Sequence, residues 1–123
     1  MPYVNEINRS IQQYLEASCG FSVENMHGFD FDDEQEIGYL FPSEIIDAVI
    51  ELDHEEAEGI FISCTALRAT QTIRAIELRL NKPVITSNQA LLWDALRLAG
   101  YDGTIENHGR LMKIPSDHSL WGT

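Results

Sequence analysis

The sequence predicts an α/β domain of three layers, with helices on both faces of a mainly parallel sheet. Short apolar strands alternate along the chain with longer helical stretches, and this alternation is typical of βαβ units. The 123 residues, 44% of them apolar, suffice for one domain with a core. Since no repeat, linker or low-complexity tract interrupts the chain, we expect residues 1–123 to form a single α/β domain.

A helix, a strand and a second helix are expected in the first half. Residues 5–18 place apolar side chains at helical spacing and are followed by Gly20, a helix stop. Residues 21–26 alternate apolar and polar side chains as a strand does. Pro42 is a favoured first helical residue, and the apolar stripe after it predicts a helix that ends before Asp53. The expected inward side chains of the two helices are Ile7, Ile11, Tyr14 and Leu15, and then Ile45, Ile46, Val49, Ile50 and Leu52.

Two more strand-helix pairs are expected in the second half. Residues 59–63 and 84–86 are short apolar stretches typical of buried strands. A helix over residues 67–80 follows the first, and a helix capped by Ser87 or Asn88 follows the second. The inward side chains should be Leu67, Ile73, Ile76 and Leu80 in one helix and Leu91, Leu92, Trp93, Leu96 and Leu98 in the other, with Arg74, Glu77 and Arg79 largely outward.

Composition excludes several classes of partner. The formal charge is −12, from 8 basic and 20 acidic residues, so the protein should bind neither nucleic acid nor an anionic membrane surface. The sequence has no apolar run near the roughly 20 residues of a membrane span, and its first residues lack the regions of a signal peptide. We therefore expect a soluble, cytoplasmic protein whose two cysteines are thiols.

Cys64 is the first candidate for chemistry. It follows the strand at residues 59–63, and ligands of open parallel sheets bind beyond the carboxyl ends of the strands. We expect a helix to begin just after Cys64, where its unpaired N–H groups would stabilise a thiolate and, with the Ser63 and Thr65 hydroxyls, could hold a substrate carboxylate or an enolate oxygen. The plainer alternative is a buried small hydrophobe, but the strand-tip position favours function. Cys19, which ends a surface helix, is interpreted as structural.

Metal and cofactor sites have little support in the sequence. The acidic stretch at residues 30–36 lacks the glycine and the final acid of a calcium-binding EF-hand loop. The four histidines are scattered, and the glycine-rich motifs of dinucleotide and nucleotide sites do not occur. We therefore expect no metal and no cofactor in the chemistry.

Four segments together resemble the second half of the aspartate/glutamate/hydantoin racemase superfamily, in its maleate isomerase and arylmalonate decarboxylase branch. They are residues 2–8 (PYVNEIN), 62–67 (ISCTAL), 82–90 (KPVITSNQA) with Trp93, and 109–112 (GRLM). The resemblance implies a flavodoxin-like half of a two-domain racemase fold. It also implies a racemase, isomerase or decarboxylase that needs no cofactor and acts beside a carboxylate of a small acid or dicarboxylate.

The same resemblance assigns roles to individual residues. Cys64 would be the acid/base at carbon, while Tyr3 and the turn at Thr65 would hold the substrate carboxylate. Around Glu34 the isomerases carry an amide that touches the substrate. The acid here is instead similar to the maleate-isomerase-like proteins associated with ectoine breakdown.

The resemblance covers one half of a two-domain family. Residues 2–8 usually follow a central strand, so the sheet should lack its first strand, and a partner chain or a rearranged sheet should fill the gap. The alternative to an enzyme is a truncated, non-catalytic domain that folds by homo-oligomerisation. A third hypothesis is a homodimer that presents two Cys64 thiols across a cleft.

Overall fold

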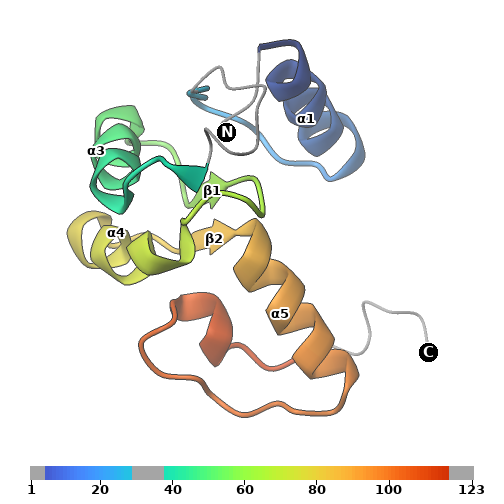
Figure 1. Ribbon diagram of the computed structural model, residues 1–123. Helices are drawn as coiled ribbons and strands as arrows, with labels where there is room; N and C mark the ends of the chain where they lie inside the picture. The colour runs from blue at the N-terminus through green and yellow to red at the C-terminus, as the bar shows by residue number, and fades with distance from the viewer. Residues whose placement is uncertain (1–4, 29–37, 117–123) are drawn as a thin grey trace.

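The protein has the three-layer α/β/α architecture that the sequence predicts (Figure 1). The structure is a computed structural model that describes residues 5–28 and 38–116. Within them the elements are, in chain order, α1 (Asn5–Ser18), α3 (Pro42–Leu52), β1 (Ile60–Ile62), the 3₁₀ helix η1 (Thr70–Thr72), α4 (Ile73–Leu80), β2 (Val84–Thr86), α5 (Ser87–Leu98) and the 3₁₀ helix η2 (Arg110–Lys113). No helix of the described ranges is both long and apolar enough to cross a bilayer.

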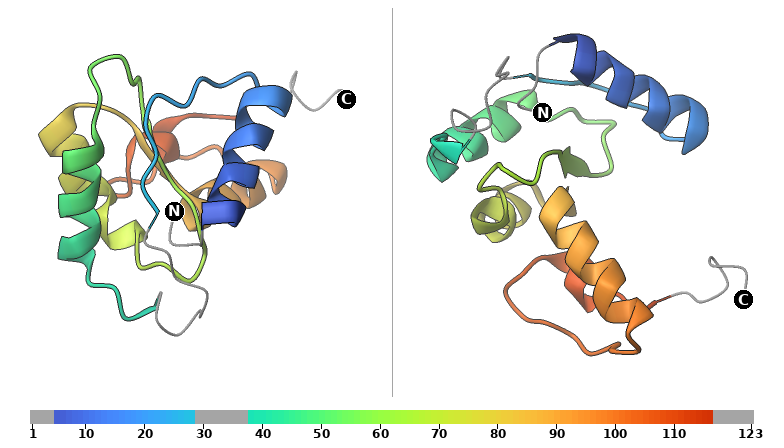
Figure 2. Two further views of the ribbon diagram at one scale, coloured as in Figure 1. Left: turned by 90° about the horizontal axis from the view of Figure 1, so that it is seen from above. Right: turned by 45° about the vertical axis from the view of Figure 1, so that its right-hand side comes forward.

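The sheet consists, in the described residues, of two parallel strands. β1 pairs with β2 so that Ile60 lies opposite Val84 and Ile62 opposite Thr86. α3 and α4 lie on one side of this pair, and α1 and α5 lie on the other (Figures 1 and 2). The crossover between the strands runs through η1 and α4, as a parallel connection requires.

The core lies between the sheet and the helices α3 and α4. Its buried side chains are Ile45, Val49, Ile62, Cys64, Leu67, Ala69, Ile73, Ile76 and Val84. The predicted inward positions of α3 and α4 are therefore largely confirmed. α3 begins at Pro42, as expected, and its entry is fixed by the Phe41 N–H, which donates to Glu44 Oε2 at 2.8 Å. α4 ends at Leu80, and Asn81 after it adopts the left-handed conformation of a helix stop.

The strand predicted over residues 21–26 does not form. This segment runs extended from the end of α1, but it belongs to no sheet in the described chain, and only Val23 and Met26 of its side chains are half-buried. Alternation of apolar and polar residues indicates the shape of a strand, whereas a strand is stable only when its N–H and C=O groups pair with a neighbour. Here β1, the nearest candidate, pairs with β2 alone.

Three helix faces also differ from the prediction. Leu91 and Leu98 of α5 are each 66% exposed, whereas Gln89 and Arg97 of that helix are buried. In α1, Ile7 and Tyr14 are exposed and Asn8 is buried. Glu77 of α4, expected outside, is buried because its carboxylate accepts hydrogen bonds from the backbone N–H groups of Val84 and Arg110. Apolar spacing predicted that these three segments contain helices, but in α4 and α5 polar side chains with backbone partners occupy inward positions.

Arg97 attaches the irregular segment after Tyr101 to α5. Its guanidinium, 2% exposed as a residue, donates to four backbone carbonyls, those of Tyr101, Gly103, Met112 and Ile114, at 2.8 to 3.2 Å. It also lies 5.8 Å from the centre of the Trp93 ring and 3.9 Å from a carboxylate oxygen of Asp102. One side chain thus holds residues 101–114, including η2, against α5.

Replacing Arg97 by methionine should lower the free energy of unfolding by about 3 kcal/mol or more, because one buried and three part-buried hydrogen bonds to carbonyls are lost at once. Urea unfolding followed by circular dichroism measures the change. Arg74→Met is the matched control, since Arg74 is an exposed residue of α4 and its loss should change stability by less than about 0.5 kcal/mol. Equal unfolding midpoints for the two variants would contradict this role of Arg97.

Candidate active site

Cys64 lies at the carboxyl end of β1, where the sequence analysis placed it. β1 ends at Ile62, and Ser63 and Cys64 follow directly. The backbone of Cys64 has φ +116°, a region that residues with a Cβ rarely adopt. Such conformations persist only where the surroundings impose them, at a cost of about 1–3 kcal/mol, and they occur preferentially at functional sites.

The turn at Cys64 is held against the beginning of α5. The Cys64 N–H donates to Ser87 Oγ at 3.0 Å, and Asn88 Nδ2 donates to the Thr65 carbonyl oxygen, also at 3.0 Å. Ser87 and Asn88 are the first two residues of α5, which continues from β2 without a linker. The carboxyl ends of both strands are therefore tied to one another beyond the last pair of the sheet.

The helix that approaches Cys64 is not the one the sequence analysis expected. α4 begins only at Ile73, since the residues after the cysteine first form turns and η1. The helix end beside the cysteine turn is that of α5, which is reached through the parallel pairing of β1 and β2. The N–H of Cys64 is not available to a substrate anion either, because the Ser87 hydroxyl already accepts from it.

Three of the five predicted site residues form one continuous turn. Ser63 and Cys64 are buried, and Thr65 is exposed. The other two, Tyr3 and Glu34, lie outside the described residues.

Sequence reasoning considered Ser87 and Asn88 only as helix caps, although the actual cap is Thr86, whose hydroxyl accepts from the Gln89 N–H. The rule that parallel strands end at the same edge of a sheet would have placed residues 86–88 beside the cysteine turn.

The Cys64 thiol is largely covered. The residue is 8% exposed and belongs to the core cluster, which is what the plainer interpretation expects. A groove of about 800 Å³ lies between residues 20–27 and β1. Cys64 is not among the residues that line it. The position of Cys64 after a strand and its strained backbone thus favour a functional role. A substrate could reach the sulfur only if the side chains that cover it moved.

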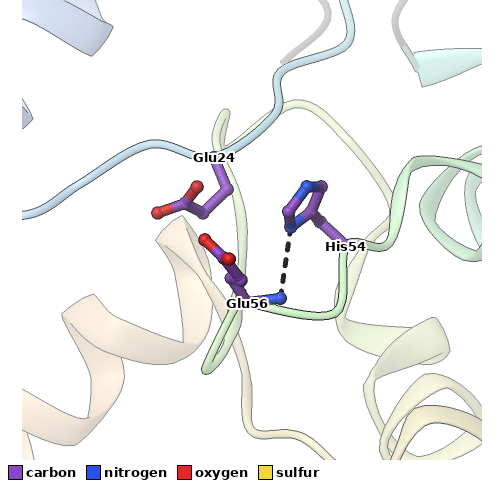
Figure 3. A group of neighbouring side chains, drawn as sticks. All are labelled: Glu24, His54 and Glu56. Carbon is purple, nitrogen blue, oxygen red and sulfur yellow. Dashed lines mark hydrogen bonds between the residues drawn. The ribbon is translucent and has the colours of Figure 1, made fainter.

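Three polar side chains of the groove lining lie close together. Ligand atoms of Glu24, His54 and Glu56 lie within 4.8 Å of one another, and Figure 3 shows the two carboxylates close together. His54 Nδ1 accepts a hydrogen bond from the Glu56 N–H at 3.1 Å, so one of the two ring nitrogens is already used within the turn. All three residues are exposed, and exposed groups with acidic residues are common without a metal ion.

The sequence of this chain matches the model of a known protein family over most of its length. The model described as arylmalonate decarboxylase matches residues 1–112. The chain belongs to the arylmalonate decarboxylase family. The resemblance of the sequence to the maleate isomerase and arylmalonate decarboxylase branch of the racemase superfamily is thereby confirmed.

Curated relatives of this chain include a maleate isomerase and an arylmalonate decarboxylase. A maleate isomerase of Alcaligenes faecalis is 22% identical over 112 residues, which cover 90% of this chain and 44% of the relative. An arylmalonate decarboxylase of Bordetella bronchiseptica is 44% identical over 45 residues, which cover 37% of this chain and 19% of the relative. The chain thus spans less than half the length of each of these relatives.

A solved structure shows the shared fold. It is a Nocardia farcinica maleate cis-trans isomerase, in a variant with serine in place of a cysteine, that holds a covalently bound succinylcysteine intermediate. It matches with a TM-score of 0.86 at 24% identity, covering 94% of this chain and 47% of that one. At this identity the likeness establishes the α/β fold of the family member.

The strain at Cys64 predicts an unusual order of stability among its variants. Cys64→Gly should be more stable than Cys64→Ala by about 1 kcal/mol, because alanine keeps a Cβ at φ +116° and glycine does not. Both variants lose the sulfur, and we expect the strain of the alanine Cβ at this φ to outweigh the packing of that atom and the lower entropy of the unfolded alanine chain. Chemical denaturation measures the difference.

Cys19 supplies the comparison. It is exposed, it follows α1, and it is not among the residues with positive φ. There alanine should equal or exceed glycine in stability. Alanine exceeding glycine at both positions would mean that Cys64 is not strained.

The hydrogen bond from the Cys64 N–H to the Ser87 hydroxyl predicts that loss of this hydroxyl destabilises the turn. Ser87→Ala leaves the buried Cys64 N–H without its acceptor and should lower the free energy of unfolding by about 1–2 kcal/mol. Amide hydrogen exchange at Cys64, followed by NMR, should accelerate in the same variant. Ser10→Ala is the control, because the Ser10 hydroxyl donates to the Glu6 carbonyl on an exposed face of α1. Unchanged exchange at Cys64 in Ser87→Ala would show that another group holds the turn.

Proposed function

We propose that this chain is part of a cofactor-independent racemase, isomerase or decarboxylase. It would act at the carbon next to a carboxylate of a small acid or dicarboxylate, with Cys64 as the acid/base. The observation that carries the proposal is the Cys64 turn: a thiol at a strand tip, with a strained backbone, fixed by two hydrogen bonds to the first residues of α5. Strain and fixed orientation at one titratable side chain are typical of groups placed for chemistry.

A thiol in this position suits proton transfer at carbon. In a decarboxylation, the bond between the α-carbon and one carboxyl carbon breaks, CO₂ leaves, and the electron pair moves into the remaining carboxyl group as an enediolate. The Cys64 S–H then donates its proton to the α-carbon, and the resulting thiolate is reprotonated from water. Racemisation differs only in its first step, in which a base removes a proton instead of CO₂, so one positioned thiol serves both.

The developing enediolate needs hydrogen-bond donors near its oxygens. The hydroxyl of Thr65, the exposed residue that follows Cys64, is proposed as one donor, and that of the buried Ser63, which precedes Cys64, as a second. Tyr3 and Glu34 are proposed as further substrate contacts on the strength of the family resemblance alone. The relatives support the substrate class, since their names include maleate isomerase and arylmalonate decarboxylase and one structure holds a succinylcysteine.

The chain spans about half the length of these relatives, so the substrate pocket is proposed to be completed by a further polypeptide segment or by a second copy. A second candidate function is a non-catalytic domain that folds by homo-oligomerisation. The burial of Cys64 in the core cluster favours this candidate, since a covered thiol does not meet a substrate.

Incorporation of solvent deuterium tests the proposed chemistry. The native protein, incubated in D₂O with phenylmalonate, maleate and aspartate, should label the carbon next to a carboxylate, as read by ¹H NMR. Cys64→Ala should reduce the labelling rate at least about a hundredfold, the usual contribution of a general acid or base. Cys19→Ala, which removes the exposed thiol, should leave the rate unchanged.

Two results would count against the catalytic proposal. Equal labelling by the native protein and Cys64→Ala would remove Cys64 from the mechanism. No labelling by the native protein, together with an oligomer by light scattering that persists in Cys64→Ala, would favour the non-catalytic candidate.

A further inference from the structure

The turn that follows Cys64 is attached to helices on both sides of the sheet. On the side of α5, Ser87 accepts from the Cys64 N–H and Asn88 donates to the Thr65 carbonyl. α3 lies on the other side of the strand pair (Figure 1), and Arg68 of the same turn contacts the residues that lead into it. The segment that carries the thiol is therefore held from two opposite directions.

Arg68 is exposed and makes two contacts with the residues before α3. Its Nη2 donates to the Leu40 carbonyl oxygen at 3.0 Å, and its Cζ lies 5.9 Å from the centre of the Phe41 ring. Of the ion pairs formed within the described residues, none includes Arg68. A hydrogen bond and a ring contact together fix the plane of the guanidinium, which a compact lysine ammonium would not reproduce.

Both ends of this connection are themselves fixed. Leu40 packs against the core cluster, and the N–H of Phe41, the residue before α3, is bound by a carboxylate of the first turn of that helix. On the other end, Leu67 and Ala69 are each 2% exposed, and the Ala69 N–H donates to the Leu67 carbonyl at 2.8 Å. Arg68 lies at the apex of this tight turn, so its side chain joins two rigid parts of the domain.

The strained backbone of Cys64 needs more than one anchor. A φ of +116° persists only where the surroundings impose it, and one exposed hydrogen bond typically contributes less than such strain costs. The pairing of β1 with β2 fixes the residues before Cys64, and Asn88 fixes Thr65 directly after it. Arg68 adds an attachment further along the same turn, on the opposite side of the sheet from Asn88.

We propose that Arg68 is a positioning residue for Cys64, because it clamps the turn onto the entrance of α3 and so holds the thiol in the orientation that proton transfer to carbon needs. The inference rests on the proposed function of Cys64 and adds a residue to it. In this role Arg68 acts through the backbone of the turn and needs no contact with substrate. Loss of the clamp lets the turn relax away from its positive φ, and the sulfur then loses its fixed direction.

The backbone of Cys64 reports the clamp directly. In Arg68→Gln, the three-bond coupling between the amide and α protons of Cys64, which depends on φ, should shift from the value of +116° toward that of extended backbone. Lys82→Gln is the matched control, because Lys82 also donates to a backbone carbonyl 28 residues away, that of His54 at 2.8 Å. Lys82 precedes β2, at the end of the strands away from Cys64, so its loss should leave the coupling unchanged.

Alkylation of Cys64 reports the orientation and cover of the sulfur. The variants carry Cys19→Ala, so that iodoacetamide modifies one thiol, and mass spectrometry follows the rate across pH. At high pH the thiol is fully ionised, and Arg68→Gln should raise this plateau rate at least about fivefold because the turn opens more often. Arg68→Lys keeps the charge without the planar contact on Phe41 and should show most of the same rise.

Three results would overturn the positioning role. They are an unchanged coupling and plateau rate in Arg68→Gln, an equal change in Lys82→Gln, and full recovery of both readouts in Arg68→Lys, which would show that charge and not position acts. None of these readouts needs turnover, so they are separate from the deuterium experiment, in which equal labelling by native protein and Cys64→Ala counts against the proposed function. Where labelling occurs, Arg68→Gln should lower kcat at least about tenfold and leave KM nearly unchanged.

Discussion

The parallel pairing of β1 with β2 determines where everything else in this domain lies. Its register brings Ile62 opposite Thr86, so the residues that follow each strand emerge at one edge of the sheet. At that edge the Cys64 N–H meets the Ser87 hydroxyl and Asn88 meets the Thr65 carbonyl. These contacts hold the strained backbone of Cys64 in place. Without the pairing, the cysteine would be one more apolar side chain of a loop.

Much of this fold could be predicted from the sequence because its elements are short and sharply bounded. Pro42, Asn81 and the apolar stretch at residues 60–62 each mark a boundary through local chemistry alone. The strand at residues 21–26 was wrong for a different reason: pairing depends on a neighbour, which the local pattern does not contain. The inward face of α5 was wrong because the Arg97 guanidinium donates to four backbone carbonyls of residues 101–114, which lie beyond the end of the helix. No periodicity of apolar residues signals such a cluster.

The candidate site was predicted in part. Cys64 was identified from its place after a strand, and family membership supports that choice. The electrostatic argument attached to it used the wrong helix, since a loop and η1 separate Cys64 from α4. The correct neighbour, α5, follows from topology and not from adjacency in the chain. The catalytic role of Cys64 and the substrate-binding roles of Tyr3, Glu34, Ser63 and Thr65 stay predictions.

β1 lines the groove with Ile60 and Phe61, and Cys64 follows two residues after its last residue, Ile62. The strand is only three residues long and has few contacts with which to absorb a shift. A displacement of β1 would therefore also move Cys64 relative to its anchor on α5. We expect the orientation of the thiol to follow the position of β1, so the rate at which an alkylating reagent modifies the sulfur would report a shift of this strand.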